Sequence, residues 1–538
     1  MAMRGPSGGS SMIGRAAARW PGARIVMRDV GLLQVLLGGL MLLPLLVSLL
    51  YGEYYSALGI LLSSVVTCGF GIAVYRMCRD APEANRRHAM LVAAAGWFIS
   101  AGFGALPFLV TAILTPLEAA QAFVPPGETY TSSLLHFRNP LHAYFESMSG
   151  FTTTGLSMAV HEPSIGRGLL FFRSLSQWVG GAGVIVLSLA IMPRPNIGGV
   201  LELYQSETSG TKIRPDVLGT ARSIWVVYTG LTTLMALFLV AATRVFAPEF
   251  SLADAIFHSV NHAMTGLATG GFSTLDDSIA GFQSYGMELA HVPPMLLGAI
   301  ALPLYYTFFR ERSLRVLWRD PQFRSLCYVC LAGVPILIGL LWDTPGVPDP
   351  VREGLFQFVS GFSGTGWQTS NIAVWGNAAV LALAWGGMVV SGSAGSTVGG
   401  VKLIRAYLVS RAVVRQVRRF FLPAGAIIPC TIADRRLTTA EIQREVADAA
   451  AFCILYVVVL AASILVASQI LGDEYGLGAI IFECVSAQGT VGLSTGITDP
   501  GMPASLEVVL ILQMWVGRLE IFPVIILLTA LLSGRRSN

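Results

Sequence analysis

The chain has 538 residues, of which 54% are hydrophobic and only 12% are charged, and its mean hydropathy is +0.65. Soluble globular proteins carry about 25% charged residues, so this chain cannot cover the surface of a soluble fold of its size and is expected to cross a membrane several times. Lys plus Arg exceed Asp plus Glu by 35 − 31 = 4. The arginines fall in short runs between apolar segments, a pattern that argues against nucleic acid as a partner and for a lipid bilayer.

Segments of about 17–25 apolar residues are long enough to span the hydrocarbon core as helices. The sequence contains ten such segments, which are Val30–Gly52, Ala57–Tyr75, Ala89–Leu114, Leu169–Met192, Ser223–Ala242, Val292–Phe309, Ser325–Trp342, Ala373–Val390, Val446–Ile470 and Ala504–Leu532. Arginines gather in the N-terminal tail, in the loops after the second, fourth, sixth and eighth segments, and at the C-terminus. Because cytoplasmic loops carry the excess of positive charge, both termini are predicted to be cytoplasmic.

The outward loop between the third and fourth segments differs from the inward loops. It runs from Thr115 to Arg167 and contains a second apolar stretch, Pro140 to Gly150, that is too short to cross the bilayer. Irregular backbone at membrane depth is tolerated where it lines a cavity or is buried in protein. The loop is therefore predicted to enter the membrane and return on the same side.

The same feature recurs in three later outward loops. The four copies read LHAYFESMSGFTTTGLS (141–157), FHSVNHAMTGLATGGFS (257–273), FQFVSGFSGTGWQT (356–369) and FECVSAQGTVGLST (482–495). One ungapped register places a glycine of each copy in a single column, namely Gly155, Gly271, Gly366 and Gly492. The residues just before these glycines are Thr154, Gly270, Thr365 and Val491.

Two further columns agree in the same register. A hydroxyl lies six residues before each glycine, at Ser149, Thr265, Ser360 and Ser486, and a polar group lies nine before it, at Glu146, His262, Gln357 and Glu483. Chance explains one glycine column but not three matching columns. The chain is therefore predicted to repeat one unit of helix, half-helix with a polar strand, and helix.

This repeat predicts an all-α polytopic membrane protein with four tandem helix–pore loop–helix repeats around one pore, preceded by two extra transmembrane helices. The expected parts are a cytoplasmic N-terminal tail (1–29), the two leading helices (30–80), and the four repeats at 81–200, 201–320, 321–440 and 441–538.

Four short strands around one axis can present a ring of backbone carbonyl oxygens that replaces the hydration shell of a weakly hydrated cation. Each half-helix would aim its C-terminus at the centre, where its partial negative charge favours cations, and the column glycine is expected to need a positive φ. The expected filter residues are Thr153, Thr154, Gly155, Thr269, Gly270, Gly271, Gly364, Thr365, Gly366, Thr490, Val491 and Gly492. Small residues also pack helices closely in lipid, but that alternative does not explain four sites in register. Of the polar column, Glu146, His262 and Glu483 either bind ions or cap and support the half-helices, and support is the favoured alternative.

The eighth apolar segment is interrupted. Between Ser391 and Gly400 the chain contains Gly392, Gly395, Gly399 and Gly400, and each glycine destabilises a helix by about 1 kcal/mol relative to alanine. Under the repeat interpretation this intramembrane loop lies below the filter and can gate the pore; a kink or a packing motif is the alternative.

Arg518 lies about halfway along the tenth segment, and a charge at that depth must face water or a partner. It is expected either to close the pore together with the loop or to form a structural salt bridge, with Glu520 or Glu483 as candidate partners. Arg173 and Gln177 in the fourth segment pose the same question, and their roles stay open.

At these residues the sequence resembles the Trk/Ktr/HKT superfamily of potassium transporters. The matching stretches are ESMSGFTTTGLS, ATGGFST, SGFSGTGWQTSN, GTVGLSTG, SGSAGSTVGGVKLIR and VGRLEIFP, and Thr490-Val491-Gly492 also resembles the TVGYG loop of potassium channels. The resemblance extends from about Val30 to Leu532, and the leading helices resemble the Trk branch, with a TrkH/KtrB-type potassium-translocating subunit as the nearest type.

The resemblance implies potassium-selective uptake across the bacterial inner membrane, with K⁺ as the transported ion and no cofactor in this chain. It also implies a homodimer with one pore per chain and a cytoplasmic nucleotide-binding regulatory subunit of the RCK type, similar to TrkA and KtrA. Family members that favour sodium carry serine in place of one filter glycine, and all four glycines are present here. The sequence departs from the family in its sixth segment, which lacks a glycine-rich pattern, and at Gly270, which stands where the first copy has Thr154.

A secondary transporter coupled to Na⁺ or H⁺ is the alternative function, because broken helices at a binding site are typical of that class. Such transporters usually contain two repeats, often inverted, whereas this chain contains four in one orientation. An enzyme is not expected, since the sequence contains no HExxH, no GxSxG with triad partners and no nucleotide-binding GxxxxGK[ST] loop.

Overall fold

The computed structural model describes residues 22–82, 84–125, 127–183, 217–423, 431–432, 435–436 and 439–533. The N-terminal residues 1–21, the end of the predicted fourth span with its following loop (184–216) and the C-terminal residues 534–538 lie outside this described part. The basic residues Arg194, Lys212, Arg214, Arg535 and Arg536, which contributed to the predicted orientation, lie there too.

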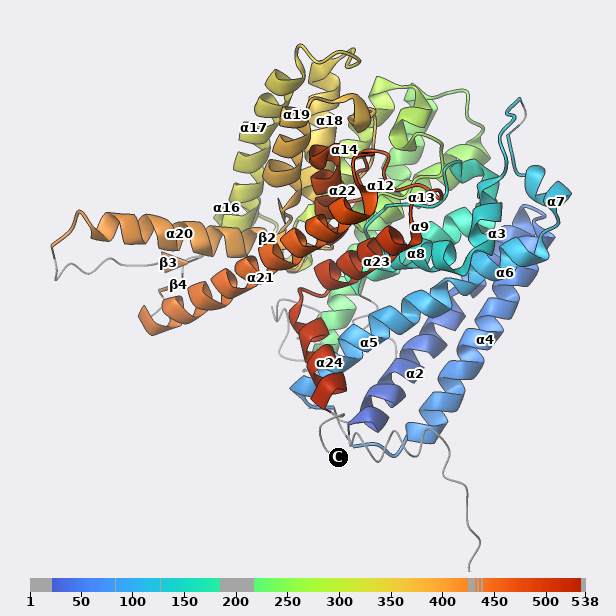
Figure 1. Ribbon diagram of the computed structural model, residues 1–538, viewed down its shortest axis with the longest axis horizontal. Helices are drawn as coiled ribbons and strands as arrows, with labels where there is room; N and C mark the ends of the chain where they lie inside the picture. Colours follow the sequence, from blue (N-terminus) through green and yellow to red (C-terminus); the bar gives the residue numbers. More distant parts are fainter. Residues whose placement is uncertain are drawn as a thin grey trace, which may run out of the picture.

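The first part of the chain forms long apolar helices, because a segment in lipid must satisfy its own backbone N–H and C=O groups. These helices are α2 (Ala23–Leu40), α3 (Leu42–Leu50), α4 (Tyr54–Cys78), α5 (Arg86–Gly104) and α6 (Leu106–Leu114). Helices α2 and α4 pack along each other (Figure 1), and a Cβ on Gly31 would lie 2.9 Å from the carbonyl oxygen of Gly71. The small residues let the two backbones approach closely.

Four half-helices follow the predicted repeat: α8 (Pro140–Phe151), α13 (Leu252–Leu267), α18 (Pro350–Ser363) and α22 (Leu477–Gly489). Three of them start at a polar cap, because the side chains of Asn139, Ser251 and Asp349 accept hydrogen bonds from backbone N–H groups of the first turn. Their apolar faces then pack into the core, in which Trp97 and Trp367 are fully buried.

The helices that flank the half-helices, in chain order, are α9 (Arg167–Ala182), α12 (Val217–Phe246), α14 (Tyr285–Ala299), α15 (Leu302–Glu311), α17 (Pro321–Leu341), α19 (Asn377–Leu383), α20 (Leu403–Arg419), α21 (Thr439–Leu471), α23 (Ala504–Arg518) and α24 (Phe522–Ser533). Shorter elements are α7 (Leu117–Gln121), α16 (Arg315–Arg319), the 3₁₀ turns η1 (Ser133–Arg138), η2 (Glu162–Ile165), η3 (Ser278–Phe282) and η4 (Ile372–Val374), and the π turn η5 (Ala384–Met388). The two-residue strands are β1 (Val390–Ser391), β2 (Val401–Lys402), β3 (Thr431–Ile432) and β4 (Arg435–Arg436), with β1 parallel to β2 and β3 antiparallel to β4.

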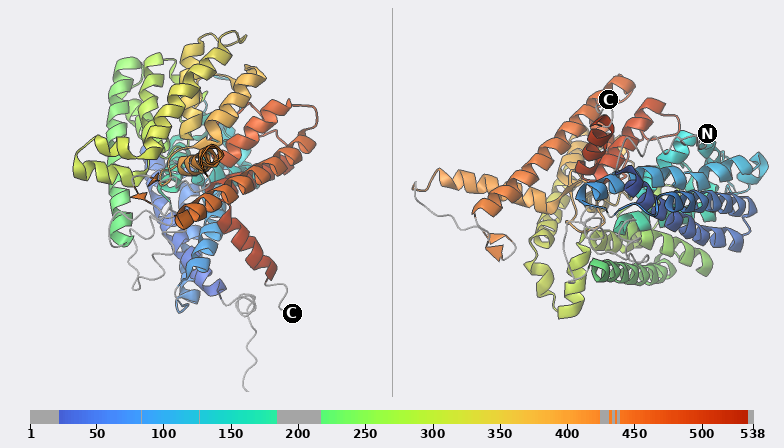
Figure 2. Two further views of the ribbon diagram at one scale, coloured as in Figure 1. Left: turned by 90° about the vertical axis from the view of Figure 1, so that its left-hand side faces the viewer. Right: turned by 90° about the horizontal axis from the view of Figure 1, so that it is seen from below.

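Within the described residues, six helical segments are long and apolar enough to cross a membrane, and two bent pairs raise that number to eight. The eighth predicted span is shorter than expected, at Asn377–Met388, and the fourth is described only as far as residue 183. Helices α20 and α21 run together away from the body of the molecule (Figures 1 and 2).

The sixth predicted span is broken rather than continuous. Helices α14 and α15 are bent by 95°, and Ile300 and Ala301 between them are non-helical. The backbone groups freed by this break bond to the intramembrane loop, since Ser393 N–H donates to Ala299 O and Leu302 N–H donates to Gly395 O, both at 2.9 Å. The loop therefore supplies the partners that a continuous helix would have supplied.

The tenth predicted span is also broken, because α23 and α24 are bent by 113°. Glu520 and Ile521 in the break have φ of +57° and +66°. A β-branched residue such as isoleucine is rarely found in this left-handed region. Arg405 of α20 forms an ion pair with Glu520 and so connects α20 to the break.

Candidate functional site

The four glycine-column segments meet in a closed ring. A Cβ placed on Gly155 would collide with the carbonyl oxygen of Gly270, and each later column glycine faces the next segment in the same way. The remaining pairs are Gly271 with Thr365 O, Gly366 with Val491 O, and Gly492 with Thr154 O. The carbonyls concerned belong to the residue just before each glycine, so the four segments surround one axis in chain order.

The backbone of the segments follows one local pattern. The column glycines have φ between +76° and +97°, and the residues two positions earlier (Thr153, Thr269, Gly364 and Thr490) have φ between +51° and +70°. The residue between the two positive-φ positions has no positive φ in any of the segments. This alternation and the crowded carbonyls together explain why glycine is needed in the column.

Each segment is tied back to its half-helix by an equivalent hydrogen bond. The N–H groups of Thr154, Gly270, Thr365 and Val491 donate to the carbonyls of Ser149, Thr265, Ser360 and Ser486 at 2.9, 2.8, 3.0 and 2.9 Å. In the first and fourth segments the serine Oγ also accepts from the column glycine N–H at 3.0 Å. The half-helices end next to the ring, so their C-terminal partial negative charges are directed towards it.

The polar column supports the strand that leaves the ring. Glu146, His262 and Glu483 accept from the backbone N–H three residues after the column glycine, at 2.8, 3.4 and 3.1 Å. Gln357 accepts from the Thr369 N–H at 2.7 Å when its amide oxygen faces that strand. The favoured alternative for Glu146, His262 and Glu483, support rather than ion binding, agrees with this geometry.

Helix α9 contributes two buried polar side chains, one turn apart, on the face that meets the ring. Arg173 pairs with Glu146 at 2.7 Å, donates to Ser157 Oγ at 2.9 Å and donates to Ser273 O at 3.1 Å. It thus joins the strands that leave the first and second segments. Gln177 bonds to the second segment itself, with its Nε2 2.5 Å from the Gly270 carbonyl oxygen.

The intramembrane loop lies against one end of the ring, beside the residues two positions before the column glycines. Thr397 Oγ1 is 3.0 Å from Thr269 Oγ1, a Cβ on Gly364 would collide with the side chain of Val398, and a Cβ on Gly399 would collide with that of Thr490. The ends of the loop are held together by β1 and β2. Gly392, Gly395 and Gly400 have φ of +47°, +82° and +67°, so the loop is not helical.

Arg518 joins the loop to α9 and to the first segment. Its guanidinium donates to Thr397 O, to the carbonyls of Gly180 and Gly181 at 2.6 and 3.0 Å, and to Thr153 Oγ1 at 3.4 Å. Of the salt-bridge candidates, Glu520 pairs with Arg405, and Glu483 bonds to Ser494, Thr495 and Thr498. Together the loop and Arg518 contact all four residues that stand two positions before the column glycines.

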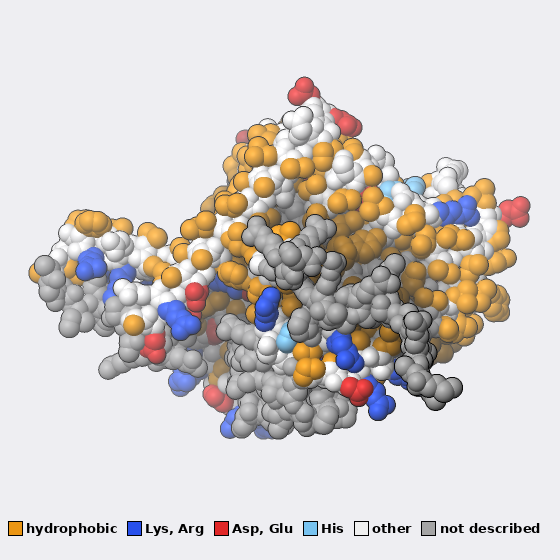
Figure 3. Space-filling view, turned by 60° about the horizontal axis from the view of Figure 1, so that its bottom comes forward, with side chains coloured by type: hydrophobic (Ala, Val, Ile, Leu, Met, Phe, Trp, Pro, Cys, Tyr) orange, Lys and Arg blue, Asp and Glu red, His pale blue; other side chains and the backbone are white. Residues whose placement is uncertain are grey.

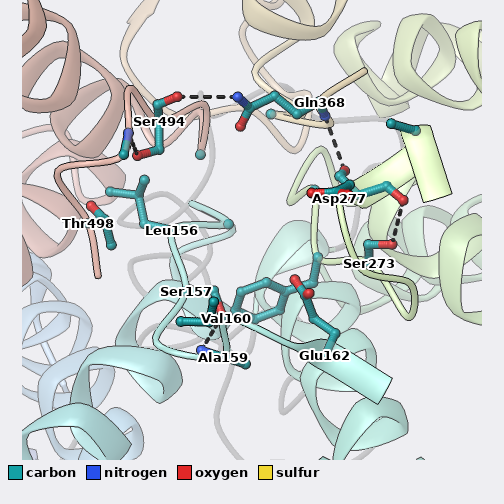
Figure 4. Close-up of a pocket in the computed structure, with 18 of the residues that line it drawn as sticks. Leu156, Ser157, Ala159, Val160, Glu162, Ser273, Asp277, Gln368, Ser494 and Thr498 are labelled. Atoms are coloured by element: carbon teal, nitrogen blue, oxygen red, sulfur yellow. Dashed lines mark hydrogen bonds between the residues drawn. The ribbon is translucent and has the colours of Figure 1, made fainter. Parts of the chain in front are cut away.

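The side of the ring opposite the loop opens into a cavity of about 650 Å³, which residues of all four segments line. Figure 4 shows Leu156, Ser273, Gln368 and Ser494 around this opening, with a hydrogen bond of 3.2 Å from Gln368 Nε2 to Ser494 O. Glu162 of the first outer loop also lines the cavity. Burial raises the pKa of its carboxyl to about 8, and Arg173, 3.9 Å away, opposes that rise.

The structure brings together every residue that the sequence predicted for the filter, and it places the loop and Arg518 on the side of the ring opposite the cavity. The sequence did not single out Thr397, whose hydroxyl and carbonyl make the central contacts of the loop. No spacing signal distinguishes this threonine from its neighbours. Gln368, which joins the third and fourth segments, was also missed, although it stands two residues after the column glycine Gly366.

Comparisons with known proteins agree with the resemblance. The TrkH family, described as cation transport proteins, matches residues 91–338 and 343–537. The chain is 30% identical over 529 residues to the Trk system potassium uptake protein TrkH of Halomonas elongata, covering 94% of this chain and 98% of that protein. The corresponding Escherichia coli K12 protein is 30% identical over 521 residues, with the same coverage.

A solved structure agrees as well. The crystal structure of the potassium transporter TrkH from Vibrio parahaemolyticus matches with a TM-score of 0.76 and 27% identity, over 94% of this chain and 98% of that one. These proteins are transporters rather than enzymes. The predicted resemblance is thus confirmed, and the chain belongs to the TrkH family of multi-pass cation transport proteins.

Proposed function

We propose that this chain takes up K⁺ through a channel-like pore, and that the ring of four segments is its selectivity filter. The observation that carries the proposal is the contact of each column glycine with the carbonyl of the next segment. Such a ring of oxygens suits a cation that loses its hydration shell easily. The filter residues are Thr153, Thr154, Gly155, Thr269, Gly270, Gly271, Gly364, Thr365, Gly366, Thr490, Val491 and Gly492.

The choice of K⁺ over other cations is supported by the relatives and by the filter glycines. The Halomonas and Escherichia relatives are named potassium uptake proteins. All four column glycines are present, and serine at one of these positions is what the superfamily resemblance associates with sodium.

The loop at 391–400 and Arg518 form the gate of the proposed pore. Their contacts to Thr153, Thr269, Gly364 and Thr490 cover the inner end of the ring. A cation that leaves the filter inward meets the guanidinium of Arg518, which repels it. Opening requires the loop and Arg518 to separate.

Helices α20 and α21 are the proposed contact region for a second copy and for a cytoplasmic nucleotide-binding regulatory subunit. Val413 and Val417 are exposed on α20, next to Arg411 and Arg418, and Phe420 is exposed just after the end of the helix. Figure 3 shows basic side chains along this projection and on the lower part of the face, below a mostly hydrophobic surface; those of α20 and α21 are all arginines. The proposed orientation in a bacterial inner membrane has these helices and both termini on the cytoplasmic side.

Uptake of ⁸⁶Rb⁺ into proteoliposomes tests the proposal. Purified protein with an internal K⁺ load should accumulate ⁸⁶Rb⁺, external K⁺ should compete, and external Na⁺ at the same concentration should compete far less. Uptake that requires a Na⁺ or H⁺ gradient would support the secondary transporter instead. Liposomes without protein, and liposomes with heat-inactivated protein, are the controls.

A further inference from the structure

The second filter segment differs from the other three at one position. Before the column glycine the first, third and fourth segments carry a branched side chain, at Thr154, Thr365 and Val491, whereas the second carries Gly270. The missing side chain leaves room behind the second quarter of the ring. A void or an unpaired polar group there would weaken the ring, because protein interiors are close-packed.

Gln177 of α9 occupies this room. A Cβ on Gly270 would lie 2.5 Å from Gln177 Oε1 and 2.8 Å from its Nε2, so the amide group stands where a side chain of residue 270 would begin. Gln177 is fully buried. No other residue type of this length offers a donor and an acceptor on one planar group without a charge.

The same amide bonds to the backbone on both sides of the column glycine. Gln177 Nε2 donates to Gly270 O at 2.5 Å, and its Oε1 accepts from Phe272 N–H at 3.1 Å. Gly271 is therefore clamped between two hydrogen bonds from one side chain. The Gly270 carbonyl is also the oxygen against which Gly155 of the first segment lies.

In two of the other segments, a pair of hydroxyl groups fills the space behind the residue before the column glycine. Thr152 and Thr154 lie 2.8 Å apart through their Oγ1 atoms, and Ser363 Oγ lies 2.8 Å from Thr365 Oγ1. The corresponding residue of the second segment is Ala268, which has no hydroxyl. The support behind this quarter comes from another helix instead.

Helix α9 is itself held at its outer end. Glu53, in the turn between the leading helices α3 and α4, accepts from the N–H groups of Arg167 and Gly168 at 2.6 and 3.0 Å, the first two residues of α9. Arg173, one turn before Gln177, is fixed by Glu146 at 2.7 Å. Gln177 thus projects from a helix that is held at two places on its N-terminal side.

We infer that Gln177 is a positioning residue that replaces the missing side chain of Gly270 and sets the selectivity of the second quarter of the filter. The inference rests on the proposed function and deepens it. The hydrogen bond from Gln177 Nε2 occupies one lone pair of the Gly270 carbonyl oxygen. It thereby fixes the orientation of this carbonyl relative to the pore axis. Loss of this bond frees the carbonyl to rotate, so a smaller cation can be accommodated.

The test compares the K⁺ over Na⁺ selectivity of variants in proteoliposomes, measured as Na⁺ competition against ⁸⁶Rb⁺ uptake. Gln177→Met keeps the volume and removes both hydrogen bonds; it should lower the selectivity ratio by about tenfold, the factor that corresponds to one ordinary hydrogen bond. Gln34→Met is the matched control, because Gln34 of α2 is an equally buried glutamine that donates to Ser100 Oγ of α5 at 2.9 Å. It should leave the ratio unchanged.

A second test enlarges the side chain at residue 270 and shortens the side chain at residue 177, so that it does not depend on a single variant. Gly270→Thr alone should abolish uptake, because its side chain collides with Gln177. The double variant Gly270→Thr, Gln177→Ala carries a threonine before the column glycine, as the first segment does, and removes the amide that would collide with it. It should transport at least tenfold faster than Gly270→Thr. Equal uptake in these two variants would overturn the inference.

The outcomes separate the inference from the proposed function. If the unaltered chain discriminates K⁺ from Na⁺ and Gln177→Met, at normal thermal stability, discriminates equally well, the inference fails and the proposed function stands. If the unaltered chain takes up no ⁸⁶Rb⁺, both fail.

Discussion

Replacing Arg518 with alanine should open the pore. The guanidinium donates to Thr397 O of the loop and to the carbonyls of Gly180 and Gly181 on α9. A hydrogen bond from a charged donor contributes about 1.5–3 kcal/mol, and the contact with Thr397 has to break when the loop moves. Removing it should shift the closed-to-open equilibrium by about ten- to hundredfold, at 1.4 kcal/mol for each factor of ten.

The assay is the initial rate of ⁸⁶Rb⁺ uptake per amount of folded protein, together with Na⁺ competition. Uptake should rise while selectivity is retained, because the filter is a separate structure. Arg518→Lys keeps the positive charge but lacks the planar guanidinium that donates several hydrogen bonds at once. This variant therefore distinguishes repulsion of the ion by the charge from hydrogen bonding that holds the loop. A variant that combines a shortened 391–400 loop with Arg518→Ala should take up ⁸⁶Rb⁺ at nearly the same rate as either single variant. The two changes are not additive because both remove the same contact. Reduced uptake in each single variant, at normal protein levels and stability, would refute the gate.

Three further predictions follow from the ring and its outer side. Gly155→Ser or Gly492→Ser should lower K⁺ over Na⁺ selectivity by about tenfold, because a side chain there meets the neighbouring carbonyl and costs more than 1 kcal/mol in a positive-φ position; unchanged selectivity in both would contradict the filter. Cysteines introduced at Gln121 and His161 should both react with an impermeant reagent from outside, and labelling from opposite sides would disprove the re-entrant loop. Since Glu162 is neutral below its raised pKa of about 8 and negative above it, K⁺ uptake should increase as external pH rises through 8, and Glu162→Gln should remove that increase.

The ring could be predicted from the sequence because one backbone geometry occurs at four places. Each column glycine has the same positive φ and the same close carbonyl, so the same residue type recurs at a fixed distance from a hydroxyl and a polar group. The half-helices could be predicted for the same reason. The loop at 391–400 could be predicted from its glycines, which cannot sustain a helix.

The breaks in the sixth and tenth spans could not be located from the sequence. Pro293 and Pro294 lie inside α14, and the chain leaves the helix only at Ile300, where the intramembrane loop supplies new hydrogen-bond partners. In the tenth span the left-handed residues are Glu520 and Ile521, and isoleucine is a poor choice for that conformation. In both places tertiary contacts override local preference.

The role of Gln177 was hidden for a related reason. Its partner Gly270 is 93 residues away in the sequence, and no spacing rule connects a glutamine on a flanking helix with a missing side chain in another repeat. Each of the two residues is unusual in the sequence, because Gln177 is a polar residue inside a span and Gly270 departs from the other filter segments. Only the three-dimensional contact joins them.

Anomalous scattering from crystals grown in Rb⁺ tests most directly whether the four segments form a cation-binding ring. An anomalous peak is expected on the axis between the carbonyl oxygens of Thr154, Gly270, Thr365 and Val491; it should weaken when K⁺ replaces Rb⁺ and persist when Na⁺ is added. A peak elsewhere in the chain, or no peak on this axis at saturating Rb⁺, would contradict the cation-binding ring.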